Sequence, residues 1–167
     1  IGGSVTGLVP GATVVLGNAP EQLAISQDGK FSFSAVPDGS SYNVNVLTQP
    51  GAPATETCTV TNGSGTVTGA KVDNIAVVCQ PQSYQVEATI IGLAAGADVV
   101  ITNNGGNTLT VTADTVVSFP AQADGSRYDV AVSGQPLQPS QVCTVTNGQG
   151  TLSGANAAVS INCVTQQ

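Results

Sequence analysis

Cys58-Thr59-Val60-Thr61-Asn62-Gly63 recurs letter for letter, later in the chain, as Cys143-Thr144-Val145-Thr146-Asn147-Gly148. Each copy is followed by a second cysteine, Cys79 or Cys163, so the offset between copies is 85 residues at the first cysteine and 84 at the second. Nearly the same offset relates Gly7-Leu8 to Gly92-Leu93, Phe33 to Phe119, Asp38-Gly39 to Asp124-Gly125 and Tyr42 to Tyr128. The sequence is therefore a tandem duplication of one domain-sized unit.

The duplication predicts two domains, residues 1–80 and 84–167, joined by a short linker at 81–83 that contains a proline. Domains of this size bury only a modest core and often carry a covalent staple. Four cysteines allow three pairings. Because two cysteines fall at matching positions of each repeat, we predict the disulfides Cys58–Cys79 and Cys143–Cys163. Each closes a loop of about 20 residues and should contribute roughly 3 kcal/mol.

The cysteines also bear on the compartment and on cofactors. Disulfides persist in oxidising surroundings, so we expect a protein that is extracellular or at a cell surface. Zinc is the alternative for four cysteines, but it requires closely spaced ligands, usually with histidine, and the chain has no histidine. We predict no cofactor and no metal site.

Charge is sparse and negative. Charged residues make up 8% of the chain, against about 25% in typical domains, and the net charge is −7. This balance argues against nucleic acid and anionic membranes as partners. No apolar run reaches the roughly 18 residues of a membrane helix, so no membrane insertion is expected. The chain has no methionine and no visible signal peptide, and it ends four residues after Cys163, which suggests a processed chain or a segment of a longer array.

Apolar residues alternate with polar ones throughout, and Gly, Pro, Asn or Asp interrupts the pattern every 8 to 12 residues or so. This pattern is typical of an all-β sandwich. We predict eight strands in each repeat, from Ser4–Leu8 to Asn74–Cys79 and from Gln85–Leu93 to Ala158–Cys163.

Alternation also predicts which side chains face the core. The inward sets are Tyr42, Val44 and Val46 in one repeat, Tyr128, Val130 and Val132 in the other, and the pair Phe31 and Phe33. A sugar-stacking role for these aromatic residues is the alternative, with no tryptophan to support it. Three Asn-Gly pairs, at Asn62, Asn104 and Asn147, predict hairpin turns, since both residues tolerate positive φ.

Several segments of the first repeat resemble a known family pattern: Gly3-Ser4-Val5-Thr6-Gly7-Leu8, Gly11-Ala12-Thr13-Val14, Asp28-Gly29-Lys30-Phe31-Ser32-Phe33, Val36-Pro37-Asp38-Gly39 and Tyr42-Asn43-Val44. The pattern is that of carboxypeptidase-regulatory-like and collagen-adhesin B-type domains, and the whole unit resembles tandem repeats of large bacterial surface proteins. The resemblance implies two tandem immunoglobulin-like or transthyretin-like β-sandwich domains. The second repeat departs from this pattern, because Thr115 replaces Gly29. The resemblance therefore does not predict the geometry of that turn.

Catalytic groups are scarce. The absence of histidine removes the commonest general base, and all four cysteines have an expected partner. We expect Asp28, Asp38, Asp114 and Asp124 to cap turn amides. Calcium at the recurring Asp38 and Asp124 is the sharper alternative, although it requires six to eight oxygen ligands. We therefore predict that the chain is not an enzyme.

Two modifications are conceivable. Asn62-Gly63-Ser64 is a glycosylation sequon, but the second copy, Asn147-Gly148-Gln149, is not. The family resemblance implies a Lys–Asn isopeptide bond in some members. Lys30 and Lys71 align with Val116 and Asn156, so neither lysine is shared by both repeats.

Two functions follow as hypotheses. The first is a non-catalytic structural module of an extracellular bacterial assembly, a filament subunit or a stalk segment, that self-associates through strand edges or end-to-end contacts. The alternative is an adhesin that binds a glycan or a surface protein through its loop tips. The candidate loops are Gly17–Glu21, Gln49–Ala54, Asn103–Asn107 and Gly134–Ser140.

Overall fold

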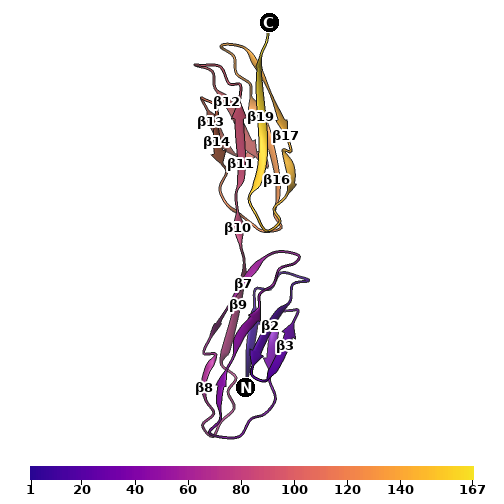
Figure 1. Ribbon diagram of the computed structural model, residues 1–167, viewed down its shortest axis with the longest axis vertical. Coiled ribbons are helices and arrows are strands. Elements are labelled where there is room, and N and C mark those ends of the chain that lie inside the picture. The colour runs from indigo at the N-terminus through magenta and orange to yellow at the C-terminus, as the bar shows by residue number, and fades with distance from the viewer. The chain divides into compact units, whose positions relative to one another are not determined.

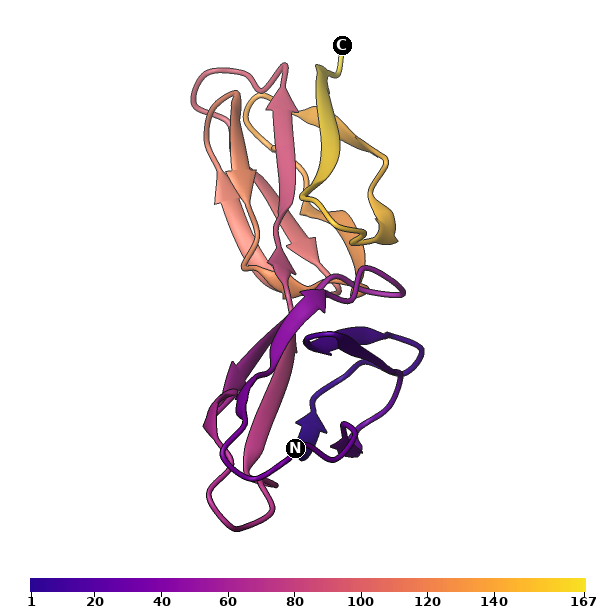
Figure 2. The same cartoon turned by 60° about the horizontal axis from the view of Figure 1, so that its bottom comes forward.

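The computed structural model describes residues 1–167, and all of its regular elements are strands. Figures 1 and 2 show arrows and connecting loops in both halves of the chain and no coiled ribbon. The prediction of an all-β protein is confirmed. No helix long and apolar enough to cross a membrane is present.

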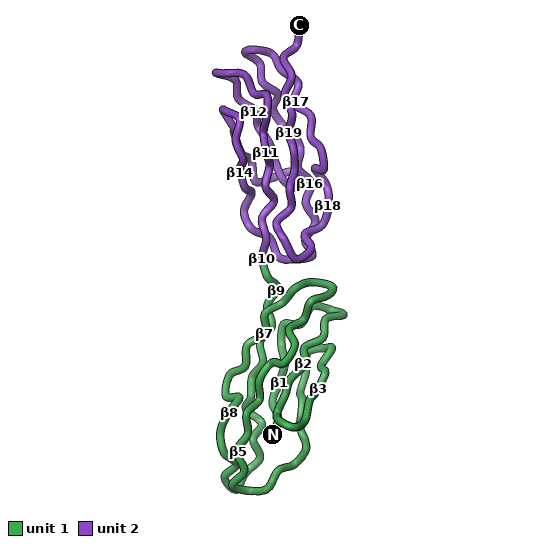
Figure 3. The backbone as a smooth tube through the Cα atoms, in the orientation of Figure 1, with its two compact units in different colours: residues 1–82 green, residues 83–167 purple.

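The chain divides into two compact units, Ile1–Gln82 and Ser83–Gln167 (Figure 3). Almost no irregular backbone lies between them, because Pro81 ends one strand and Ser83 begins the next. The residues expected to form a linker therefore mostly belong to strands.

Unit 1 consists of nine strands in three sheets. The strands are β1 (Gly2–Thr6), β2 (Val14–Asn18), β3 (Glu21–Ile25), β4 (Gly29–Ser32), β5 (Ser41–Asn43), β6 (Asn45–Thr48), β7 (Glu56–Thr61), β8 (Ser64–Thr66) and β9 (Ile75–Pro81). One sheet has the order β4-β1-β9-β7, and β1 and β9 run parallel within it. The others have the orders β3-β2-β6 and β5-β8. Only Val44 separates β5 from β6, so these two sheets follow one another along a nearly continuous strand.

Unit 2 repeats this plan. Its strands are β10 (Ser83–Tyr84), β11 (Val86–Ile91), β12 (Val99–Asn103), β13 (Gly106–Val111), β14 (Thr115–Ser118), β15 (Gln122–Ala123), β16 (Arg127–Gly134), β17 (Gln141–Thr146), β18 (Gln149–Thr151) and β19 (Ala157–Thr165). The sheet orders are β14-β11-β19-β17 and β13-β12-β16-β18, with a small extra sheet of β10 and β15. β11 and β19 run parallel, as β1 and β9 do. The duplication in sequence is thus a duplication in topology.

Each unit has one hydrophobic core to which both larger sheets contribute. In unit 1 the core includes Val5 and Val77 of one sheet and Val14 and Leu16 of the other. In unit 2 it includes Ile90, Phe119 and Ile161 beside Val99 and Ile101.

The predicted inward faces are confirmed. Val44 and Val130 are buried, and the flanking tyrosines and valines of their strands pack against the cores. Phe31 and Phe33 are buried edge to face, with ring centroids 6.0 Å apart. Their rings are therefore core residues and form no sugar-stacking surface.

Of the three predicted hairpin turns, one is formed in the structure and two are not. Asn104 and Gly105 have φ of 53° and 71° and join the paired strands β12 and β13, so this hairpin is confirmed. Asn62 and Asn147 also have positive φ, but the hairpins predicted there are wrong. The strands on either side, such as β7 and β8, belong to different sheets. These two turns carry the chain from one sheet to the other.

Candidate functional site

The structure forms both predicted disulfides, and each joins two neighbouring strands of one sheet. Cys58 of β7 lies directly opposite Cys79 of β9, and Cys143 of β17 lies opposite Cys163 of β19. All four cysteines are buried, and none is free. The immunoglobulin fold of antibodies instead places its disulfide between two sheets. The two bonds indicate an oxidising environment.

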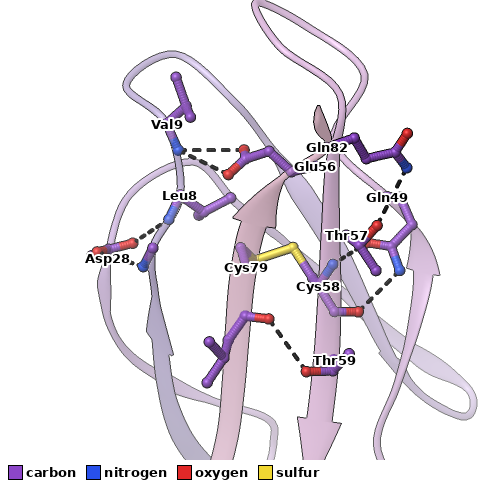
Figure 4. The surroundings of a disulfide bond; sticks show 12 residues. Leu8, Val9, Asp28, Gln49, Glu56, Thr57, Cys58, Thr59, Cys79 and Gln82 are labelled. Atoms are coloured by element: carbon purple, nitrogen blue, oxygen red, sulfur yellow. Dashed lines mark hydrogen bonds between the residues drawn. A yellow bond between two sulfur atoms is a disulfide. The ribbon is translucent and has the colours of Figure 1, made fainter. Parts of the chain in front are cut away.

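In each unit one glutamine side chain forms two hydrogen bonds with the backbone of the first cysteine, an arrangement that we call the glutamine bracket. The Gln49 amide accepts a hydrogen bond from the Cys58 N–H at 2.7 Å and donates one to the Cys58 carbonyl at 3.0 Å (Figure 4). Gln135 binds Cys143 with the same two distances. Since β7 and β17 end their sheets, these amides take the place of a neighbouring strand at that point.

The bracket was missed by the sequence analysis, although a signal exists. Gln49-Pro50 recurs as Gln135-Pro136 shortly before each cysteine. The proline carbonyls also accept hydrogen bonds from the edge, from Glu56 N–H in unit 1 and Gln141 N–H in unit 2. The Gln-Pro loop therefore covers the outer edge of the cysteine strand.

Replacing Gln135 with alanine should lower the free energy of unfolding of unit 2 by about 2 kcal/mol, because it leaves a partly buried N–H and carbonyl without their partner. Chemical denaturation of the oxidised chain measures this loss. Gln166→Ala, at an exposed position near the C-terminus, is the matched control and should change stability by less than about 0.5 kcal/mol. Equal effects of the two variants would contradict a structural role for the bracket.

The turn aspartates cap backbone amides, as predicted. Asp28 accepts hydrogen bonds from Gly7 and Leu8, and Asp114 accepts the matching bonds from Gly92 and Leu93. Asp114 therefore keeps the contact that Asp28 makes, although Thr115 replaces the glycine that follows Asp28.

Asp38 and Asp124 have the same role in another turn. Asp38 accepts from Gly69, and Asp124 accepts from Gly154. No group of three or more acidic, cysteine or histidine side chains is placed to hold a metal ion. The recurrence of these two aspartates is explained by turn capping without calcium.

Glu56 is a buried carboxylate that the sequence analysis did not single out. It is 1% exposed, and it accepts two long hydrogen bonds from Val9 N–H, of 3.2 and 3.3 Å. Gln141 is the matching residue of unit 2, and its side chain forms hydrogen bonds with three partners. It accepts from Ala94 N–H and donates to the Gly92 carbonyl, both at 2.9 Å, and to Thr165 Oγ1 at 3.2 Å.

Glu56→Gln should therefore raise the free energy of unfolding of unit 1, by about 1 kcal/mol. The amide can donate to the Gly7 carbonyl, as Gln141 donates to that of Gly92, and it removes a buried charge. Thermal and chemical unfolding at neutral pH would detect the gain. The reverse change, Gln141→Glu, should destabilise unit 2, and a stabilising effect there would contradict the comparison between units.

The four candidate loops are largely tied down from within. Asn18 and Asn103 accept hydrogen bonds from Asn43 N–H and Asp129 N–H, and Gln49 and Gln135 form the brackets. The exception is Leu137 in the loop 134–140, which is 81% exposed. The sequon residue Asn62 donates its Nδ2, the atom a glycan would occupy, to the Asn74 carbonyl, which favours the turn interpretation.

Comparison of the chain with models of known protein families finds no match. Comparison with curated protein sequences finds none either.

Proposed function

We propose that this chain is a non-catalytic structural module of an extracellular bacterial assembly, either a filament subunit or a stalk segment of a surface protein. In this proposal each unit is an immunoglobulin-like or transthyretin-like β-sandwich that serves as a rigid, disulfide-stapled building block. The two domains of this proposal are the compact units Ile1–Gln82 and Ser83–Gln167.

One observation carries the proposal: the same set of backbone-fixing polar groups occurs in both units. A buried disulfide, a glutamine bracket and two aspartate caps recur at matching positions. These side chains bind their own backbone, which leaves them unavailable for chemistry and makes each unit resistant to local opening. A tandem array under tension requires every one of its units to resist opening, and both units carry these contacts.

The sheet edges limit which strands can pair with another copy of the chain. The Gln-Pro loops cover part of the outer edge of β7 and β17, which opposes strand addition there. The remaining terminal strands of the larger sheets are β4, β3 and β6 in unit 1 and β14, β13 and β18 in unit 2. We therefore assign strand-edge contacts between copies to these strands.

Electron microscopy of the native, non-reduced chain, together with its mass in solution, tests the proposal. Filaments with a regular axial repeat, or larger masses at higher concentration, would support a self-assembling subunit. A monomer that forms no assembly at any concentration, alone or joined to further copies in tandem, would count against it.

Leu137 favours a second candidate function, an adhesin that binds a surface protein through a loop. The loop is held at one end by the Gln135 bracket and at the other by the hydrogen bond from Gln166 N–H to the Ser140 carbonyl. A large, mostly exposed apolar side chain on such a loop is suited to fill a pocket on a partner. The matching residue of unit 1 is Gly51, so the feature belongs to one unit. Loss of cell adhesion in Leu137→Gly, with stability unchanged, would support this function, and unchanged adhesion would oppose it.

A further inference from the structure

Unit 1 has a pocket of about 310 Å³ over β1 and β4, and two of the three basic residues of the chain line it. Lys30 comes from β4, and Lys71 and Asp73 come from the segment that precedes β9. Gly2, Gly3 and Ser4 of β1 also line the pocket. The volume lies at the lower end of the roughly 300–1,000 Å³ found for ligand pockets.

The charge of this pocket is opposite to that of the chain. Its lining holds two cations and one carboxylate, whereas the rest of the chain holds one cation and nine carboxylates. The Lys71 Nζ and Asp73 carboxylate lie 3.7 Å apart, and both side chains are mostly exposed. An exposed pair of this kind contributes little, so Lys71 remains available to a stronger anionic partner.

Unit 2 supplies its own carboxylate at the matching place. Glu87 takes the position of Gly2: Gly2 lies opposite Ser32, and Glu87 lies opposite Ser118. The Glu87 carboxylate accepts a hydrogen bond of 2.9 Å from Asn156, the counterpart of Lys71. In unit 1 the internal acid is replaced by glycine while the facing amide is replaced by a cation.

Gly2 and Gly3 contribute backbone but no side chain to the lining of the pocket. A side chain on Gly3 would overlap the Ile75 carbonyl oxygen, and one on Gly2 would meet the Phe31 carbonyl oxygen. Neither position can supply a side chain to fill the pocket unless the strands shift. Asp73 is the one carboxylate of the lining, so the pocket keeps a net positive charge that suits an anion of another molecule.

We propose that this pocket binds an acidic sugar residue of an extracellular glycan. Lys30 and Lys71 bind the sugar carboxylate through charge-assisted hydrogen bonds. The Ser4 hydroxyl and the Asp73 carboxylate bind ring hydroxyls, a role in which Asp73 attracts a sugar but repels a polyacidic peptide. The site lies on a sheet, away from the candidate loops, and does not depend on self-assembly.

Titration calorimetry of the intact oxidised chain with D-glucuronate at low salt tests the site. We expect saturable binding at least about tenfold tighter than that of acetate or of a glutamate-containing peptide. D-glucose, which lacks the carboxylate, should show no binding. Lys30→Val and Lys71→Asn introduce the unit 2 residues and should each weaken binding about tenfold or more, since a charged hydrogen bond contributes that much. Lys71→Arg should preserve binding.

Arg127→Gln is the control, because Arg127 is the third basic residue and lies in β16 of unit 2. It should leave glucuronate binding unchanged. The proposal is overturned if glucuronate does not bind, if the lysine variants bind it like the original chain, or if acetate or the peptide binds as tightly as glucuronate. Circular dichroism of each variant verifies that the fold is intact.

Discussion

Replacing Cys143 and Cys163 together with alanine is expected to lower the free energy of unfolding of unit 2 by about 3 kcal/mol. The disulfide joins residues 20 apart in sequence, and its loss frees this loop in the unfolded chain. At about 0.05–0.15 kcal/mol per residue, a unit of this size has a total stability on the order of 4 to 12 kcal/mol. The bond is therefore a large share of the stability, and its loss should expose unit 2 to proteases near physiological temperature.

Chemical denaturation under oxidising conditions, followed by circular dichroism, measures the loss. The matched double variant in unit 1, Cys58→Ala with Cys79→Ala, should weaken unit 1 by a similar amount because its loop spans 21 residues. Each variant should shift the transition of its own unit only. A loss below about 1 kcal/mol in both would mean that the disulfides do not staple the units.

The rate at which a reductant breaks the disulfides of the unsubstituted chain is an independent test of their burial. All four sulfurs belong to buried residues, so a reductant must wait for local opening of the paired strands. We expect reduction to accelerate steeply with denaturant well below the unfolding midpoint. Immediate reduction in the native state would contradict the burial of these bonds.

Local patterns predicted the core and most of the strands because alternation and turns are properties of neighbouring residues. The eight strands expected in each repeat are nine and ten in the structure, because the segment expected as one strand at Tyr42–Leu47 forms β5 and β6, and β10 and β15 were not predicted. Val44, Val130 and the Phe31–Phe33 pair followed from period two alone, and the disulfides followed from the duplication. The hairpins at Asn62 and Asn147 were wrong because a turn residue specifies local φ, whereas the partner of the next strand is decided by contacts far along the chain. An Asn-Gly pair serves equally well at a crossing between sheets.

The polar framework was harder to predict for the same reason. Gln49 brackets Cys58 only because β7 ends its sheet, and sheet order is not visible in the alternation. Glu56 is a buried acid, and its counterpart in unit 2 is Gln141. Acidic residues are usually found at the surface, so nothing in the sequence predicted Glu56 in the interior. The small sheet of β10 and β15 was also missed, since two residues on each side are too few to show a period.

Phe119→Ala should lower the free energy of unfolding of unit 2 by about 4 kcal/mol, the largest loss expected from any single substitution discussed for this chain. The Phe119 ring is fully buried, and it is the one phenylalanine of unit 2. Val117 takes the place that Phe31 has in unit 1, so no second phenylalanine ring is present to move into the cavity. The backbone N–H of Phe119 also donates to the Val86 carbonyl, which ties this segment to the start of β11 and limits how far its backbone can move into the cavity.

Phe33→Ala is the matched change in unit 1 and should cost less, about 3 kcal/mol, because the neighbouring Phe31 ring can relax into part of the space. Denaturation of both variants, with each unit followed through its own transition, measures the difference. Phe31→Val introduces the unit 2 residue and should make unit 1 as sensitive to the loss of Phe33 as unit 2 is to the loss of Phe119. If Phe119→Ala costs less than about 1 kcal/mol, the ring does not hold the two sheets of unit 2 together, and the core assigned to that unit is wrong.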